Sequence, residues 1–278
     1  MRDLRDATVL ITGASRGLGV DMARAFCEAG CKIALAARSQ TELAAVAETL
    51  GGGIVSRRVL AVPADVGDEA AREALVRAVE ARLGSIDILV NNAGIECVCD
   101  FEEMPAEVIE QIIRVNVTGL VLLTRLVVPG MIQRRRGHIL NIASVAGLMA
   151  VPHNAVYSAS KHAVVGLSRS LRIELADHGI GVSALCPGFV EGGMFLRWGR
   201  RPPAFAGLVS AAAVAHAAVD CVRRNRGEVV VNPGLGKIAD WFQAMAPDFS
   251  ARMLGWTGVV DFLREQARRN ARGGDSAE

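Results

Sequence analysis

The sequence predicts an α/β fold, a doubly wound parallel sheet of about seven strands within a single domain. Short, fully apolar runs alternate with segments of helical periodicity along most of the chain, the order that places helices on both faces of a parallel sheet. The first apolar run also leads directly into a glycine-rich turn and a helical pattern, as the first βα unit of such a sheet does. The 278 residues, 51% of them hydrophobic, are enough for a large core.

Composition excludes several other classes of protein. The net charge of +2 gives no reason to expect a nucleic-acid partner. No apolar run reaches the ~20 residues that span a bilayer, and the acidic N-terminal segment does not resemble a signal peptide, so we expect a cytoplasmic protein. The six scattered cysteines are expected to be free thiols. Cys97-Val98-Cys99 could form half of a metal site, but no second Cys/His pair has ligand spacing, and we predict no metal.

Strands and helices are expected in regular alternation. Periodicity, bounding glycines and prolines and short apolar runs place their limits. Strands are expected at 8–11, 32–36, 57–62, 87–90, 137–142, 180–186 and 228–231, and helices follow the glycine turn and lie at 41–50, 68–83, 105–131, 155–177 and 210–224.

The glycine-rich turn at 12–19 joins the first strand to the first helix. Backbone N–H groups and the helix dipole at such a junction hold a pyrophosphate, and glycine permits the close approach of backbone to phosphate. The alternative is a turn that serves packing alone. The residues predicted to bind cofactor here are Gly13, Ser15, Arg16, Gly17, Leu18 and Gly19.

Tyr157 is the single tyrosine of the chain, and Lys161 follows it by four residues at the start of a helical pattern. Residues at this spacing share one helix face, so the ammonium is expected near the phenol. A neighbouring cation lowers the pKa of a phenol, and a tyrosine tuned in this way exchanges a proton with a carbonyl or alcohol oxygen. The alternative is a packing tyrosine beside a solvated lysine.

These two motifs together resemble the short-chain dehydrogenase/reductase (SDR) family. Thr-Gly-x-x-x-Gly-x-Gly at 12–19 and Tyr-x-x-x-Lys at 157–161 carry the resemblance, which extends over about 7–190. It implies a Rossmann-type NAD(P)-binding domain and an oxidoreductase that interconverts a ketone or aldehyde and an alcohol. It also assigns Tyr157 and Lys161 to the cofactor site as well as to catalysis.

The end of the second strand bears on the choice of cofactor. NAD-selective sites usually place an acid there for the ribose 2′-hydroxyl, whereas this chain has Ala37 followed by Arg38, with Arg16 nearby in the glycine turn. Two guanidinium groups suit a 2′-phosphate. We therefore predict NADP(H) rather than NAD(H), which remains the alternative if both arginines are merely solvated.

Two further segments match the family's cofactor positions. Asp65 and Val66 follow the third strand, where family members contact the adenine, although Asp65 could instead cap the next helix. Asn92, Ala93 and Gly94 belong to the Asn-Asn-Ala-Gly sequence after the fourth strand, which in the family supports the central sheet and the cofactor. A purely structural turn is the alternative.

Two polar residues complete the predicted catalytic set. Asn116 interrupts the apolar face of a long helix, and asparagine is unfavourable inside a helix because its side chain competes for backbone hydrogen bonds. In the family, such an Asn perturbs the helix and holds a water in a proton relay to the lysine. A satisfied buried amide is the alternative. Ser144 ends the fifth strand, and the family's serine at this position stabilises charge on the substrate oxygen.

The segment after the sixth strand departs from the family pattern. Pro187, Gly188 and Val190 match the turn beside the nicotinamide, but Gly192 stands where a threonine usually contacts the carboxamide. We expect backbone groups to replace that contact or the loop to be more mobile before cofactor binds.

The remainder of the chain is expected to close the substrate site. We predict one domain over 1–278, with a core at 7–232, a substrate lid at 191–210 and helices at 235–270. Large apolar residues in the lid, such as Phe195 and Trp198, indicate an apolar substrate of steroid, retinoid or fatty type. The C-terminal helices close the pocket or meet a second subunit; membrane-surface contact is an alternative that we do not expect.

The sequence therefore predicts an NADP(H)-dependent oxidoreductase with the catalytic residues Asn116, Ser144, Tyr157 and Lys161. One alternative retains this chemistry on a 3-oxoacyl thioester. Another, of a different class, is an NADP-binding regulator without turnover. The long helices at 105–131 and 155–177 pair subunits in the family, which implies a homodimer or homotetramer.

Overall fold

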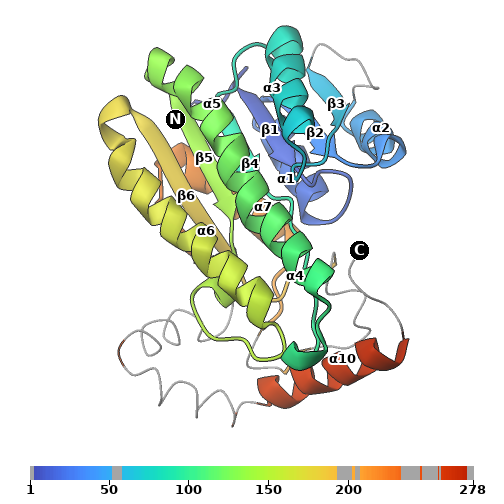
Figure 1. Cartoon of the computed structure of the whole chain (residues 1–278). Coiled ribbons are helices and arrows are strands. Elements are labelled where there is room, and N and C mark those ends of the chain that lie inside the picture. The colour runs from blue at the N-terminus through green and yellow to red at the C-terminus, as the bar shows by residue number, and fades with distance from the viewer. Residues whose placement is uncertain are drawn as a thin grey trace.

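The computed structural model describes residues 3–51, 58–192, 202–203, 207–232, 245, 256 and 258–273. Within them, seven parallel strands form one sheet of order β3-β2-β1-β4-β5-β6-β7 (Figure 1). The predicted doubly wound fold is thus confirmed. The strands are β1 (Thr8–Thr12), β2 (Lys32–Ala37), β3 (Val59–Pro63), β4 (Ile88–Asn91), β5 (Gly137–Ile142), β6 (Ile180–Pro187) and β7 (Glu228–Val231).

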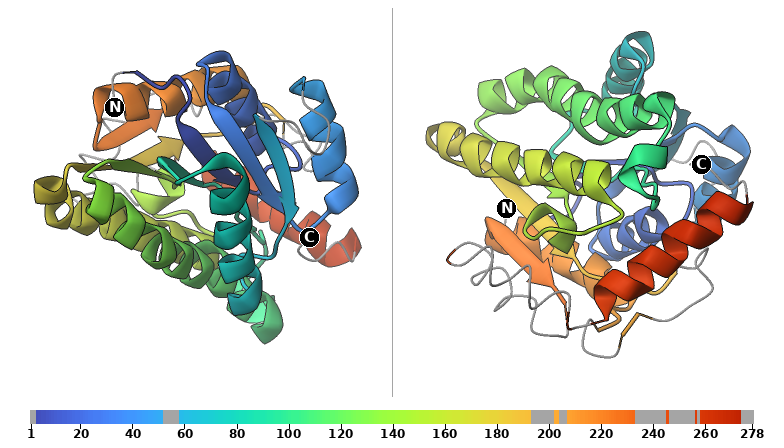
Figure 2. Two further views of the ribbon diagram at one scale, coloured as in Figure 1. Left: turned by 90° about the horizontal axis from the view of Figure 1, so that it is seen from above. Right: turned by 60° about the horizontal axis from the view of Figure 1, so that its bottom comes forward.

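Helices cover both faces of this sheet (Figure 2). Apolar side chains of α1, α2 and α7 pack on one face, and those of α3, α5 and α6 pack on the other. The α-helices are α1 (Leu18–Glu28), α2 (Gln40–Thr49), α3 (Glu69–Leu83), α4 (Ala106–Ile113), α5 (Leu120–Arg134), α6 (Ala155–Glu174), α7 (Ala211–Arg224) and α10 (Val259–Gly273).

The strand order fixes where a ligand binds. From β1 the chain runs through β2 to β3 at one edge, and from β4 it continues in the opposite direction to β7. The connections that leave β1 and β4 therefore diverge to opposite faces of the sheet, and a crevice opens at the carboxyl ends of these strands. The glycine-rich turn and the Asn-Asn-Ala-Gly sequence both lie at this crevice.

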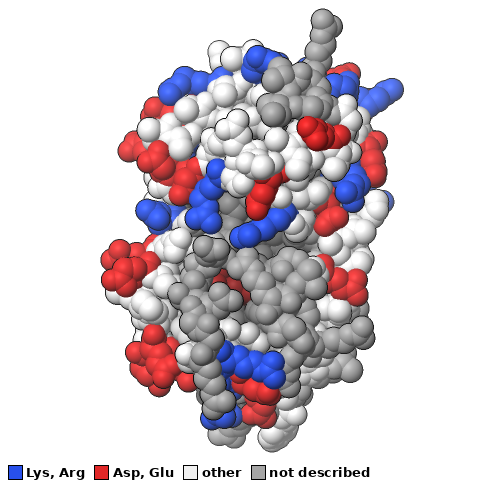
Figure 3. Space-filling model, turned by 90° about the vertical axis from the view of Figure 1, so that its right-hand side faces the viewer, with Lys and Arg blue, Asp and Glu red and all other residues white. Residues whose placement is uncertain are grey.

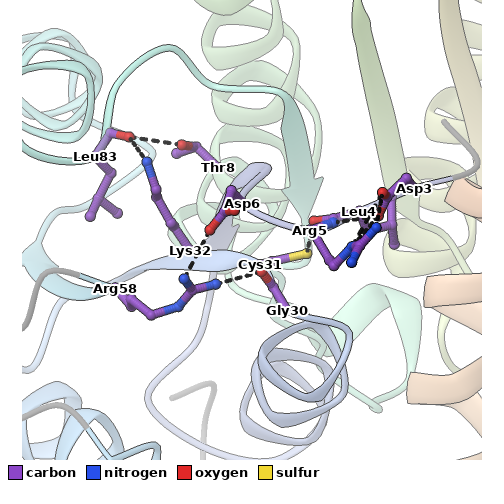
Figure 4. A network of polar contacts seen from close by, with 10 residues as sticks. All are labelled: Asp3, Leu4, Arg5, Asp6, Thr8, Gly30, Cys31, Lys32, Arg58 and Leu83. Atoms are coloured by element: carbon purple, nitrogen blue, oxygen red, sulfur yellow. Dashed lines mark hydrogen bonds and ion pairs between the residues drawn. The ribbon is translucent and has the colours of Figure 1, made fainter.

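The amino-terminal ends of β1, β2 and β3 are joined by side-chain contacts among the N-terminal segment, the start of β2 and the residue before β3 (Figure 4). The Arg58 guanidinium pairs with Asp6 at 2.9 Å and donates to the Gly30 carbonyl oxygen at 2.6 Å. The Lys32 ammonium donates to the Leu83 carbonyl oxygen at 3.4 Å. These contacts join the starts of β1, β2 and β3 and leave the carboxyl ends of the strands for the site.

A π-helical turn, η2 (Arg114–Gly119), interrupts the long helix expected after Pro105 and divides it into α4 and α5. Asn116 lies within this turn, so the predicted perturbation of the helix is present. The stretch Ala106–Arg134 is long and apolar enough to cross a membrane by length and composition, contrary to our expectation for this chain. Its buried residues, among them Leu123 and Val127, pack on the sheet in the manner of a core helix.

Helix α10 lies apart from the sheet and crosses the bottom of the molecule in Figure 1. Its buried residues Phe262, Leu263 and Ala267 pack with Val98 from the loop after β4, and Asn270 Nδ2 donates to the Val98 carbonyl oxygen at 2.8 Å. Of the helices expected over 235–270, this one is described. Most of the predicted lid, 193–201 and 204–206, lies outside the described residues, and the proposed division into core, lid and extension stays a prediction.

Candidate active site

A pocket of about 910 Å³ opens at the carboxyl ends of the strands. Its lining includes every residue predicted to bind cofactor, together with three of the four predicted catalytic residues, Ser144, Tyr157 and Lys161. The exception is Asn116, which lies behind the pocket wall. One concave site therefore unites motifs that are separated by up to about 170 residues in the sequence, and its size suits a small-molecule ligand.

The glycine turn forms the floor of one end of the pocket. Gly13 has φ +64°, and a Cβ there would lie 2.8 Å from the Ala93 Cα atom. A Cβ on Gly19 would fall on the Gly13 carbonyl oxygen. Gly17, with φ +57°, stands at the N-cap of α1 and has no side chain to cover the first backbone N–H groups of that helix. Backbone donors at a helix N-terminus fit a pyrophosphate.

Asn92 and Thr12 hold this turn against the loop after β4. Asn92 Nδ2 donates to the carbonyl oxygens of Thr12 and Gly13 at 2.9 and 3.0 Å, and Thr12 Oγ1 accepts from the backbone N–H groups of Asn92 and Ala93, both at 3.0 Å. The neighbouring Asn91 ties strands together instead, since its Nδ2 donates to Asn141 Oδ1 at 2.9 Å. Asn92 therefore supports the glycine-rich turn, and Asn91 supports the sheet.

Basic side chains mark the part of the pocket beyond β2. Arg16 and Arg38 are both exposed and both line the pocket, and Ala37 ends the strand. Figure 3 shows basic side chains across the middle of this side of the molecule, with acidic residues around them. Glu42 also lines the pocket and adds a negative charge beside the two arginines. The arrangement fits a nucleotide ribose.

Asp65 and Val66 line the pocket, and Asp65 does not cap the next helix. Its Oδ1 accepts from the Gly67 N–H at 2.8 Å, whereas Asp68 is the N-cap of α3 and accepts from the Ala71 N–H at 2.7 Å. The alternative role considered for Asp65 is therefore wrong, and its side chain instead orders the turn at the pocket wall.

The side chains predicted to be catalytic come from the turn after β5 and from α6. Ser144 follows β5, and its Oγ accepts from the Ala146 N–H at 3.1 Å. Tyr157 and Lys161 lie on one face of α6, as their spacing predicts, with the Lys161 Nζ atom 5.5 Å from the tyrosine ring centroid. Lys161 Nζ also donates to the Ile142 carbonyl oxygen at 2.9 Å, which fixes it at the end of β5.

Burial, rather than the charge of Lys161, has the largest effect on the pKa of Tyr157. Removal from solvent raises the pKa of Tyr157 above its usual value, Glu96 raises it further, and a hydrogen bond with Ser144 lowers it. Burial lowers the pKa of Lys161 to about 8, which Cys186 and Glu96 partly oppose. Our expectation that Lys161 makes the phenol acidic is thus not met in this geometry, because desolvation disfavours the phenolate. Tyr157 is instead held as a phenol, the form that donates a proton.

Asn116 is a satisfied buried amide beside this group. Its Oδ1 accepts from the Ile95 N–H and its Nδ2 donates to the Ile95 carbonyl oxygen, both at 2.9 Å, while Nδ2 also contacts Ser160 Oγ at 3.0 Å. A Cβ placed on Gly94 would lie 3.4 Å from Asn116 Oδ1 and 3.5 Å from Lys161 Nζ. The amide therefore lies near the ammonium, and its role in a proton relay stays a prediction.

The other end of the pocket contains residues that sequence reasoning missed. Glu96 lies two residues after the Asn-Asn-Ala-Gly sequence, and Asn154 lies three residues before Tyr157; their positions beside the two motifs could have indicated them. Val151 and Leu263 form apolar walls. The sequence predicts that the segment containing Leu263 closes the pocket. It does not indicate which residue of α10 reaches the site, because α10 is far along the chain from the other lining residues.

Gly192 also lines the pocket, and its backbone has φ +89°, a conformation that glycine adopts without strain and threonine does not. Glycine at this position therefore permits a backbone conformation that threonine would adopt only with strain. Among the described residues no group of three or more His, Cys, Asp or Glu side chains could hold a metal ion. The Sγ atoms of Cys97 and Cys99 lie 3.6 Å apart, and both thiols are free.

A glycine cradle for a dinucleotide, joined to a serine, a buried tyrosine and a lysine, defines a nicotinamide-nucleotide-dependent oxidoreductase. The sequence matches the family described as short chain dehydrogenase over residues 7–201. The chain belongs to this family and is an enzyme that acts on CH–OH groups with NAD(P).

Individual relatives support this assignment. The ketoacyl reductase HetN of Nostoc sp. is 36% identical, with 99% of this chain and 97% of the relative covered. The granaticin polyketide synthase putative ketoacyl reductase 1 of Streptomyces violaceoruber is 42% identical over 66% of this chain and 67% of its own length. A solved 3-ketoacyl-(acyl-carrier-protein) reductase of Brucella melitensis, complexed with NADH, superposes with a TM-score of 0.77 at 31% identity and covers 84% of this chain and 99% of its own.

Proposed function

We propose that this enzyme reduces a ketone on a largely apolar substrate with NADPH, and oxidises the corresponding alcohol in the reverse direction. The observation that carries the proposal is the meeting of Ser144, Tyr157 and Lys161 in the pocket that also contains the glycine turn. Val151, Phe189 and Leu263 give the substrate end apolar walls, which favour an apolar body on the substrate.

The nicotinamide supplies the hydride when the cofactor is bound, and the protein positions the substrate and controls the proton. Ser144 Oγ would donate to the substrate oxygen and stabilise the negative charge that develops on it. The Tyr157 phenol, protonated because burial raises its pKa, would transfer its proton to that oxygen. Lys161, held on the Ile142 carbonyl oxygen, would favour the phenolate left behind through its positive charge.

A 3-oxoacyl thioester is the second candidate for the substrate. The names of the relatives from Nostoc and Streptomyces, both ketoacyl reductases, favour it. Such a substrate also carries a ketone on an apolar chain, so the same pocket would serve it. The two candidates differ in whether the thioester and its carrier contribute to recognition.

The preference for NADPH is supported by Arg16 and Arg38 at the pocket and by Ala37 in place of an acid. The bound NADH of the Brucella enzyme and the nearby Glu42 favour the other cofactor. Because each charge-assisted hydrogen bond contributes about 1.5–3 kcal/mol, two such bonds to a 2′-phosphate would outweigh one acidic neighbour. We further propose a cytoplasmic location and a homo-oligomer.

One assay tests the function and the cofactor together. Nicotinamide absorbance is followed with free ketones, with 3-oxoacyl thioesters on a small carrier and with the same acyl groups on an acyl carrier protein, each with NADPH and with NADH. Turnover of ketones with NADPH supports the main proposal, and turnover of thioesters alone supports the second candidate. If the enzyme reduces none of these carbonyl compounds, both candidates are contradicted.

Arginine variants assign the preference to residues. Arg16→Ala and Arg38→Ala should each raise the KM for NADPH about tenfold or more while changing the KM for NADH little. Arg77→Ala, an exposed arginine on α3 outside the pocket lining, is the matched control and should change neither. A lower KM for NADH than for NADPH in the parent enzyme would overturn the cofactor assignment.

A further inference from the structure

Asn154 occupies the N-cap position of α6, yet its side chain makes no capping hydrogen bond. Asparagine at an N-cap normally accepts from a backbone N–H in the first turn of the helix. Here the Nδ2 atom donates instead to Glu96 Oε2 at 3.2 Å. The side chain is only 4% exposed and lies in the pocket wall. It has therefore exchanged a local stabilising role for a place in the substrate pocket.

The other end of this amide is a buried acceptor. Within the part of the chain that the structure describes, Asn154 Oδ1 has no hydrogen-bond donor. The amide orientation follows from the carboxylate, because a flip would bring two acceptors together. A buried polar atom without a partner costs free energy. Because Asn154 lines the ligand pocket, an occupant that supplied a donor to this side chain would remove that cost.

Glu96 brings a second acceptor to the same place. The preceding residue, Ile95, is fixed through both of its backbone polar groups by Asn116, which anchors the loop that carries the carboxylate. The Glu96 charge affects both Tyr157 and Lys161 and raises the pKa of each. The carboxylate lines the same pocket as the Tyr157 and Lys161 side chains.

We propose that Glu96 and Asn154 recognise a hydrogen-bond donor on the substrate, a hydroxyl or an ammonium group near the carbonyl carbon. The apolar walls formed by Val151 and Leu263 contact the remainder of the molecule. This specificity rests on the proposed carbonyl reduction and narrows its substrate to a ketone with an adjacent donor group. A pocket built to bond such a group strongly discriminates against the analogue that lacks it, because the Asn154 Oδ1 acceptor then stays unpaired.

A merely structural role for the pair predicts a different result. The contact between Asn154 and Glu96 also ties the loop after β4 to α6, and its loss could loosen the pocket for every ligand. In that case the variants would weaken all ketones alike. The discriminating quantity is therefore the ratio of affinities for matched ligands, rather than the affinity for any one of them.

The experiment measures ligand binding without turnover. Tyr157→Phe protein saturated with NADPH is titrated with medium-chain ketones, and nicotinamide fluorescence reports the complex. On the carbon α or β to the carbonyl, each ketone carries a hydroxyl, a dimethylammonium group or an alkyl group of the same shape. At least one donor-bearing ketone should bind about tenfold or more tightly than its alkyl partner. The better of the two donor arms identifies the group.

Variants in the same background assign the preference to the pair. Glu96→Leu should abolish the preference for a hydroxyl and for an ammonium, whereas Glu96→Gln, which still offers an acceptor, should abolish it for the ammonium and reduce it less for the hydroxyl. Asn154→Leu should lower the preference about tenfold. Glu107→Gln, exposed on α4, is the matched control and should leave the ratio unchanged.

Equal binding of donor-bearing and alkyl ketones to the parent background would overturn the inference, as would a ratio that survives Glu96→Leu. Catalytic assays with Tyr157 intact keep the proposed function separate. If ligands discriminate as expected but no carbonyl is reduced, the reaction assignment fails and the recognition stands. If ketones of both kinds are reduced equally well, the reaction stands and the recognition fails.

Discussion

The cofactor end of the pocket is lined mainly by the main chain, and the substrate end is lined mainly by side chains. At the cofactor end the main chain forms the surface, and Gly13 and Gly19 approach their neighbours too closely to accept a Cβ. At the substrate end side chains form the surface, contributed by the loop after β4, by α6 and by α10. The first end suits a ligand common to a whole family, whereas the second can change residue by residue. It should therefore be possible to alter selectivity for the substrate without loss of cofactor binding.

The sharpest separation of the two ends is expected from Tyr157→Phe. Loss of the phenolic proton donor should lower kcat about a thousandfold, while the dissociation constant for NADPH, measured by fluorescence, should change less than about twofold because the ring remains in place. Retention of more than a tenth of the parent kcat would contradict the catalytic assignment of Tyr157.

A smaller effect, on cofactor binding rather than on turnover, is expected from Gly19→Ala. The added methyl group would meet the Gly13 carbonyl oxygen, displace the turn and weaken NADPH binding about a hundredfold, or about 3 kcal/mol, as measured by fluorescence titration. Gly166→Ala is the matched control, since a Cβ there meets nothing within 4 Å. It should leave cofactor affinity unchanged and stabilise α6 by about 0.5–1 kcal/mol. Parent-like affinity in the Gly19 variant would show that the cradle is not backbone-limited.

The smallest effect is expected from a change in pH, which should alter kcat/KM more than it alters NADPH affinity. Reduction needs Lys161 as an ammonium, and burial lowers its pKa to about 8, so kcat/KM should be constant below pH 8 and fall about tenfold for each pH unit above it. Tyr157 stays protonated over this range because its own pKa is raised. NADPH affinity should vary less, since Lys161 is the one predicted cofactor-binding group that titrates in this range, whereas arginine and backbone groups do not.

The single tyrosine of the chain gives an independent check on this pH dependence. Ultraviolet absorbance of the phenolate reports on Tyr157 alone, and it should appear at higher pH in the folded protein than in the unfolded chain. A phenolate signal that forms near neutral pH would restore the original expectation of an acidic phenol. A flat kcat/KM up to pH 10 would instead contradict the lowered pKa of Lys161.

The same contrast explains what the sequence could predict. The sheet, and the meeting of the predicted cofactor residues in one pocket, followed from short motifs next to apolar strands, because a backbone cradle needs glycine at fixed spacing. The pairing of Tyr157 with Lys161 followed from helix geometry. The pKa of Tyr157 could not be predicted, since it depends on burial by distant segments. Glu96 and Asn154 also escaped notice, because their contact joins residues 58 positions apart.

The position of α10 has a consequence for how such enzymes diversify. The helix supplies Leu263 to the pocket and rests on Val98 and Phe189, but it takes no part in the sheet. Substitutions in it can therefore remodel what the enzyme accepts without disturbing the residues that carry out the redox step. For protein engineering, this appendage is a natural place to graft new preferences, and a fusion or deletion near it is expected to shift substrate range before it impairs folding.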